Sequence, residues 1–122
     1  MPWFKVDDTL HSHPKARRAG PAAMGLWALA GAYSSAYKLD GFVPDDYVRT
    51  WPSGRRLASL LVCAEMWDAG EKDGDPGWWF HDWDDYQETS EQIERVRELA
   101  RERQRRRREA QIKAREEAVT NV

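Results

Sequence analysis

The last quarter of the chain constrains the fold most, because it is too highly charged to enter a hydrophobic core. Residues 91–122 carry 10 basic side chains against 7 acidic ones, whereas residues 1–90 carry 9 against 14. Four arginines follow one another at positions 105–108. Neighbouring cations repel each other, so such a run is typical of a solvated segment or of one with an anionic partner. The overall charge of −2 therefore hides a basic segment joined to an acidic one.

The length of 122 residues suits one domain with an appendage. We expect residues 1–88 to form the domain and residues 89–122 to form an Arg-rich helical arm. Seven tryptophans, all before Asp84, supply apolar area for a core. Cys63 is the only cysteine, which excludes a disulfide framework and a Cys-rich zinc site. With no signal peptide and no apolar run of about 20 residues, a cytoplasmic protein without membrane contact is expected.

Local patterns predict several short elements. Residues 3–6 are β-prone, and residues 14–19 are expected to form a short helix that stops at Gly20. A firmer helix begins at Pro21, since proline suits the first helical position. Its apolar residues recur every three or four positions, which predicts one buried stripe. The members of this stripe are Leu26, Leu29, Ala30, Tyr33 and Tyr37.

Two further helices and a hairpin are predicted downstream. Residues 44–50 and 54–65 have helical patterns, and Ser53 is the expected N-cap of the second. Aromatic runs at 66–69 and 78–81 flank the loop 72–77, which is rich in Asp, Gly and Pro and indicates a β-hairpin. The predicted fold is therefore mainly α with a small β-hairpin (α+β), a winged helix-turn-helix followed by a long charged helix.

In this architecture the third helix of the winged domain can enter the major groove of DNA. Counted from the helix that begins at Pro21, the third helix is 54–65. Arg55 and Arg56 stand at its beginning, and arginine suits bidentate contact with guanine or phosphate. The rest of the helix offers only Ser59 for hydrogen bonding. The alternative is a core helix with two solvated arginines, so sequence-specific reading of bases is weakly supported.

The predicted wing tip is acidic, because Lys72 stands beside Asp73 and Asp75. Carboxylates repel phosphates, so the wing is expected to be structural or to contact a protein. Trp78 and Trp79 are neighbours on a strand and point to opposite faces. One is expected to pack inward, and the other to be exposed or covered by a partner.

The arm carries the strongest signal for nucleic-acid binding. Residues 95–108 hold eight arginines against two glutamates, and the pairs Glu91–Arg95, Glu102–Arg106 and Glu109–Lys113 have the favourable i,i+4 order. A self-stabilised solvated helix and a protein-contact helix are the alternatives to phosphate binding. The expected phosphate contacts in the arm are Arg101, Arg103, Arg105, Arg106, Arg107 and Arg108.

No pattern in the chain indicates catalysis. His11, His13 and His81 lack the spacing of metal ligands, so they are interpreted as surface or packing residues. Walker, Rossmann and nucleophile-elbow motifs are missing from the sequence. We therefore expect no enzyme activity, no cofactor and no metal.

Six short motifs occur in one order along the chain. They are Trp3–Asp8, His13–Lys15, Gly25–Trp27, Asp40–Pro44, Phe80–Trp83 with Tyr86-Gln87, and the Arg-rich helix. With these motifs the chain is similar to small winged-helix proteins of actinobacteriophages and prophages, and to the N-terminal domain of phage replication initiators (replisome organisers) of the DnaD-like type. The resemblance implies a winged-helix fold, a role in phage DNA replication or its control, and self-association through the winged domain.

Three functions remain open at this point. The first is a DNA-binding protein accessory to replication, which binds the backbone of duplex DNA in preference to single strands. The second is an interaction module that docks onto a host or phage protein through the long helix and exposed tryptophans. The third is a transcription regulator with a specific operator, which the apolar residues 57–64 make the weakest of the three.

Overall fold

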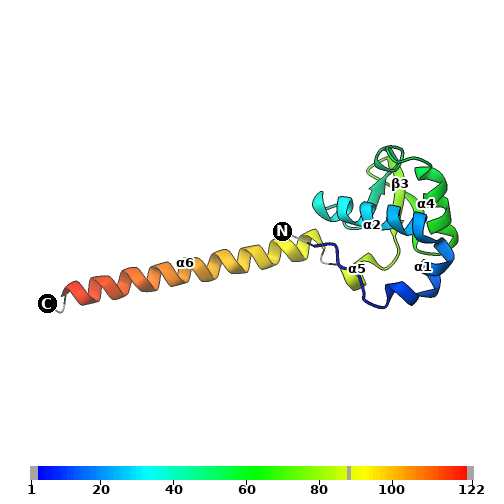
Figure 1. Ribbon diagram of the computed structural model, residues 1–122. Helices are drawn as coiled ribbons and strands as arrows, with labels where there is room; N and C mark the ends of the chain where they lie inside the picture. The colour runs from blue at the N-terminus through cyan, green and yellow to red at the C-terminus, as the bar shows by residue number, and fades with distance from the viewer. Residues whose placement is uncertain (1–2, 88, 121–122) are drawn as a thin grey trace. The chain divides into compact units, whose positions relative to one another are not determined.

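The computed structural model describes residues 3–87 and 89–120 of the chain. Two compact units are present, residues 1–89 and residues 90–122. The first unit combines short helices with a three-stranded antiparallel sheet, and the second is one helix (Figure 1). The expected mainly α, α+β class is thereby confirmed. The boundary predicted after residue 88 falls at a residue outside the described ones.

The first helices begin and end where proline and glycine stand. A short 3₁₀ turn, Leu10–Ser12, precedes α1 (Pro14–Ala19) and α2 (Pro21–Ala36). His13 caps α1, because its Nδ1 accepts a hydrogen bond from the N–H of Lys15 at 3.2 Å. Gly20 has a φ of +88°, which ends α1 and leaves Pro21 to start α2. The predicted helix at residues 14–19 is confirmed.

The remaining elements of the first unit surround a small sheet. β1 (Phe42–Pro44) is followed by α3 (Asp45–Val48) and α4 (Gly54–Cys63). β2 (Trp67–Lys72) and β3 (Asp75–Phe80) form the predicted hairpin, and α5 (Trp83–Tyr86) comes last. The order in the sheet is β1-β3-β2, with every pair antiparallel. β3 is therefore the central strand.

The hairpin turn is shorter than the predicted loop at residues 72–77. Asp73 and Gly74 alone form the turn, with φ values of +51° and +85°, and glycine tolerates this left-handed conformation best. Pro76 lies within β3, beyond the end of β1, so its missing N–H removes no bond from the ladder. Gly77 is also part of β3, and the close approach of the Val43 carbonyl oxygen leaves no room for a Cβ there.

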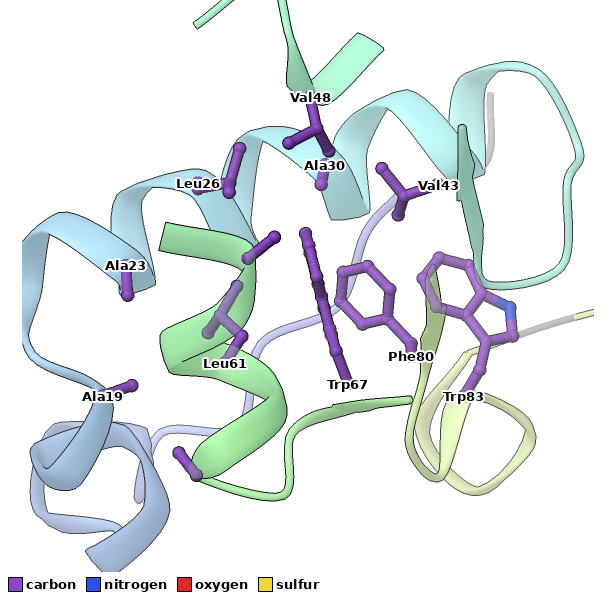
Figure 2. Packing of buried hydrophobic residues seen from close by; sticks show 12 residues of the cluster. Ala19, Ala23, Leu26, Ala30, Val43, Val48, Leu61, Trp67, Phe80 and Trp83 are labelled. Carbon is purple, nitrogen blue, oxygen red and sulfur yellow. The ribbon is translucent and has the colours of Figure 1, made fainter. Parts of the chain in front are cut away.

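The core lies where α2, α4 and the sheet meet. Figure 2 shows Trp67 and Phe80 next to each other below α2, with Leu61 of α4 on one side. Trp67 and Leu61 are fully buried, and the ring centroids of Trp67 and Phe80 are 5.4 Å apart. Aromatic rings bury large areas, which explains how so short a domain forms a core. Small residues, Ala23 and Ala30, let α2 approach closely.

The N-terminal segment closes the core without forming the predicted strand at residues 3–6. The ring of Phe4 lies 5.0 Å from that of Trp27 and stacks at 5.7 Å on that of Trp83. Gln87 is buried, and its side-chain Oε1 accepts from the N–H of Lys5 at 2.8 Å. Its Nε2 donates to the carbonyl oxygen of Lys5 at 2.6 Å. The amide of Gln87 therefore makes the two bonds that a neighbouring strand would make.

Two other local predictions were confirmed only in part. Leu26 and Ala30 are buried, but Leu29 is 43% exposed and Tyr37 is 67% exposed, so the stripe on α2 is only partly covered. Ser53 does precede α4, but its side chain makes no capping bond. Its backbone is left-handed, with a φ of +55° and a ψ of +23°, whereas a capping serine has an extended backbone.

The second unit is a single helix, α6 (Ser90–Thr120), with an estimated length of about 46 Å. Its described side chains are almost all exposed. Across residues 3–87 and 89–120, no helix combines the length and the apolar character that crossing a membrane requires.

Candidate nucleic-acid interface

Arg55 of α4 is held by the first unit itself. Its Nε and Nη2 donate to the two carboxylate oxygens of Asp45 at 3.0 and 2.7 Å, a bidentate pair. The Asp45 side chain is only 14% exposed, and it forms a second ion pair in which Nε of Arg49 lies 3.1 Å from Oδ2. The hydrogen bond from Arg55, and then the two positive charges, lower the pKa of Asp45. Arg55 must break this bidentate pair before its Nε and Nη2 can bind a phosphate.

The rest of the exposed surface of α4 has little hydrogen-bonding capacity. Arg56 is exposed and forms no ion pair with any described carboxylate. The Ser59 hydroxyl donates to the carbonyl oxygen of Arg55 at 3.0 Å, so it is already engaged. Leu60 and Cys63 are exposed beside it. This helix therefore presents one unpaired guanidinium and no amide for reading adenine.

At the hairpin tip, by contrast with α4, the one cation is already engaged by its own chain. Nζ of Lys72 donates to the carbonyl oxygen of Leu39 at 3.2 Å and lies 5.8 Å from the ring centre of Trp79. Asp73 and Asp75 are exposed at the turn. The wing tip that the sequence predicts is thus acidic in space as well, and it would repel a phosphate.

Trp78 and Trp79 are both half-buried by their own chain. Trp78 lies on the core side of the sheet, with its ring 6.1 Å from that of Trp67. Trp79 packs on the other side, 5.1 Å from Phe42, and its Nε1 donates to the carbonyl oxygen of Glu71 at 3.2 Å. The two rings point to opposite faces, as expected for neighbours on a strand. Neither ring is available in full to a partner.

The arm holds the largest group of exposed cations. Arg95 pairs with Glu91 at 3.0 Å and Arg106 with Glu102 at 2.8 Å, as the i,i+4 spacing predicts. Arg101 lies 3.8 Å from Glu94. The expected pair between residues 109 and 113, both described, does not form. Six further arginines are exposed and have no ion pair with a described carboxylate: Arg97, Arg103, Arg105, Arg107, Arg108 and Arg115.

A patch of aromatic rings on α2 and α3 was missed by the sequence analysis. Tyr33 stacks on Tyr47 at 4.0 Å, Tyr37 lies 4.7 Å from Tyr33, and Trp51 lies 6.5 Å from Tyr47. Tyr37 and Trp51 are 67% and 39% exposed. We call these four residues the aromatic patch. The i,i+4 spacing of Tyr33 with Tyr37 and of Tyr47 with Trp51 was the available signal, but the first pair was assigned to a buried stripe and the second was not used.

A cavity of about 170 Å³ lies in the first unit beside the N-terminal segment. Its walls include Phe4, Trp27 and Trp83, and His81 stands at its edge. Nδ1 of His81 is 3.1 Å from Oδ2 of Asp68, and this hydrogen bond, together with nearby negative charge, raises the pKa of His81. Among the described residues, no three His, Cys, Asp or Glu side chains are placed to share a metal ion.

Comparison of the chain with models of protein families, with curated proteins and with solved structures found no match. The functional interpretation therefore depends on the residues and geometry of this chain.

Proposed function

We propose that the protein binds duplex DNA through its sugar–phosphate backbone, using the arginines of α6. The observation that carries this proposal is the set of exposed arginines at 97, 103, 107 and 108, none of which pairs with a described carboxylate. Each can neutralise a phosphate and release a counterion. Arg101 and Arg106 are held by glutamates of the same helix, and Arg56 adds a contact from α4.

We further propose that the first unit is a winged helix-turn-helix. Its support is the element order α2-β1-α3-α4-β2-β3 and the sheet order β1-β3-β2. In this order the β2–β3 hairpin directly follows α4, as a wing follows the third helix of a winged domain. In this proposal the unit supplies shape and protein contacts. Its acidic wing tip and its ion-paired Arg55 favour that role over base reading.

The binding mode follows from which groups are available. Specific reading of bases needs Arg, Asn or Gln side chains that reach base edges. The exposed part of α4 offers only Arg56 for that purpose, so a regulator with a specific operator is disfavoured. Contacts to phosphates fix a protein on DNA without reading sequence. An accessory role in phage DNA replication, the function that the resemblance implies, is compatible with such contacts and is proposed here.

The test is a titration of labelled duplex and single-stranded DNA with the full chain and with residues 1–90. Binding by the full chain is expected to weaken steeply between about 50 and about 200 mM salt, with a log–log slope of about −0.9 per phosphate contact. Residues 1–90 contain the whole core and are expected to bind at least tenfold more weakly. Equal binding by the two proteins would refute the proposal.

The aromatic patch favours a second candidate function, a contact with another protein or another copy of this chain. Tyrosine and tryptophan are enriched at the centres of interfaces, because large rings supply contact area at low entropic cost. Sedimentation of the wild type and of Tyr37→Ser over a range of concentrations tests self-association. Pull-down of host or phage replication proteins by the same two chains tests a heterologous contact. Identical behaviour of the two chains in both assays would argue against this function.

A further inference from the structure

All but one of the glutamates of α6 lie on one side of the helix. Residues three, four or seven apart lie on the same helical face. Six of the seven acidic residues follow such spacings and fall within about 80° of arc, at about 100° per residue. Only Glu117 lies outside this acidic stripe. Its members are Glu91, Glu94, Glu98, Glu102, Glu109 and Glu116.

The opposite side of α6 combines small or neutral side chains with arginines. Spacings of three and four place one row along its centre, composed of Ile93, Val96, Ala100, Gln104, Arg107, Gln111, Ala114 and Ala118. Arg97 and Arg108 border this row on one side, and Arg103 borders it on the other. We call the row and these three arginines the acid-free face. The row is too polar for a coiled coil, because Arg107 occupies its middle.

The ion pairs reinforce the separation of the two faces. Glutamates of the acidic stripe hold Arg95 at 3.0 Å, Arg101 at 3.8 Å and Arg106 at 2.8 Å. The arginines of the acid-free face form no ion pair with a described carboxylate, and all of them are exposed. Most of the positive charge that is not paired within α6 therefore lies on the side away from the glutamates, with Arg105 and Lys113 as the exceptions.

We propose that duplex DNA occupies the acid-free face, with α6 lying in the major groove and the acidic stripe turned to solvent. This rests on the proposed function and specifies the surface that performs it. A major groove about 12 Å wide admits one helix. The small or uncharged side chains of the row suit the floor of the groove. Arg107, the exception within the row, and the arginines on both borders are long enough to reach the phosphates of the two walls. The opposite orientation would bring six carboxylates against the phosphates.

Duplex is favoured over single strands because binding of single strands relies on aromatic stacking, and α6 has no aromatic residue. An acidic protein is the other anionic partner that this face could accept. An acidic protein would not require a row that is neutral except at Arg107 between two borders of cations, whereas a groove has phosphate walls and an uncharged floor.

The test compares two triple variants of the full chain that remove the same number of charges. R103Q/R107Q/R108Q changes the acid-free face, and R95Q/R105Q/R106Q changes residues on or beside the acidic stripe. Glutamine and arginine have similar helix propensities, and far-UV circular dichroism checks that both variants stay helical. Anisotropy of a labelled duplex gives the affinity at about 50 and about 200 mM salt.

The first variant is expected to lose three phosphate contacts, which lowers the magnitude of the salt slope by about 2.7. Between these two salt concentrations, the affinity of the wild type should therefore decrease by a factor about 40 times larger than that of the variant. The control variant is expected to change the slope by less than about 0.9, the value that corresponds to one phosphate contact. R103K/R107K/R108K keeps the charges and is expected to restore most of the slope. If it does not, charge on this face is not what binds DNA.

Equal losses in the two glutamine variants would overturn the acid-free face as the DNA surface and leave DNA binding by α6 intact. No binding of the duplex by the wild type would instead refute the proposed function. Tighter binding of a labelled polyglutamate than of the duplex would identify an acidic protein as the partner and overturn the inference.

Discussion

Replacing Gly31 with alanine is expected to destabilise the first unit only while Phe4 is present. Gly31 is buried on α2, and a Cβ at this position would overlap the ring carbons of Phe4. The ring is packed 5.0 Å from Trp27 and stacked 5.7 Å from Trp83, so moving away from a Cβ at Gly31 would give up these contacts. The two positions are therefore coupled through a single contact.

The magnitude follows from two opposing effects. Overpacking a core costs about 1–3 kcal/mol, and overlap with several ring atoms places this case near the upper end. Alanine in place of glycine within a helix gains about 1 kcal/mol. The net loss for Gly31→Ala is thus about 2 kcal/mol. With Phe4→Ala, which itself costs about 3 kcal/mol, the overlap disappears and the gain of about 1 kcal/mol remains. The coupling free energy is about 3 kcal/mol.

Urea denaturation of the wild type, the two single variants and the double variant measures this coupling. The matched control is Gly25→Ala, since Gly25 is exposed on the same helix and a Cβ there meets nothing within 4 Å. It is expected to stabilise both backgrounds by about 1 kcal/mol. If Gly31→Ala changes stability with the same sign with and without the Phe4 ring, the packing argument is wrong.

Three further outcomes follow from contacts in the first unit. Gln87→Ala should cost about 2 kcal/mol for its two bonds to Lys5 and should speed cleavage by trypsin after Lys5, measured by limited proteolysis. The raised pKa of His81 adds stability that is complete below its unfolded pKa of about 6.5 and is lost as the pH rises through the folded pKa. His81→Asn should therefore lessen the fall in unfolding midpoint between about pH 5.5 and about pH 8.5. The lowered pKa of Asp45 adds stability above its unfolded pKa of about 3.9, which is lost as the pH falls through the folded pKa. Asp45→Asn should abolish this acid dependence and release Arg55, steepening the salt slope of DNA binding by up to about 0.9 in an anisotropy titration.

Features fixed by neighbouring residues could be predicted from the sequence. The helix at residues 14–19 lies between a proline and a glycine, which act locally whatever the rest of the chain does. The hairpin follows in the same way from Asp73-Gly74 between two aromatic runs. The pairs of Glu91 with Arg95 and of Glu102 with Arg106 follow from helical spacing alone.

Features that depend on distant residues were not predictable from local patterns. Gln87 reaches Lys5 across 82 positions, and this bond determines that the N-terminal segment is not a strand. Tyr33 was assigned to the core because its spacing is helical, yet the structure stacks it on Tyr47 near the surface. Spacing identifies a face of a helix, but only the packed neighbours decide whether that face is covered.

For the candidate interface, the sequence identified Arg55 as a cation at the start of α4 but gave no sign of its partner. Asp45 stands ten positions earlier, on another helix, and binds both Nε and Nη2 of Arg55. A count of charges along the chain cannot distinguish such a paired guanidinium from an unpaired one. The three-dimensional contacts therefore shift the proposed DNA surface towards α6.

All seven tryptophans lie between residues 3 and 83, and the long helix that follows has none. Indole emission consequently reports on the compact unit alone, with the fully buried ring of Trp67 as its innermost reporter. Ellipticity at 222 nm, by contrast, includes the 31 residues of α6. Fraying of the arm on warming would thus lower the ellipticity before the fluorescence changes, and one unlabelled sample resolves the two processes.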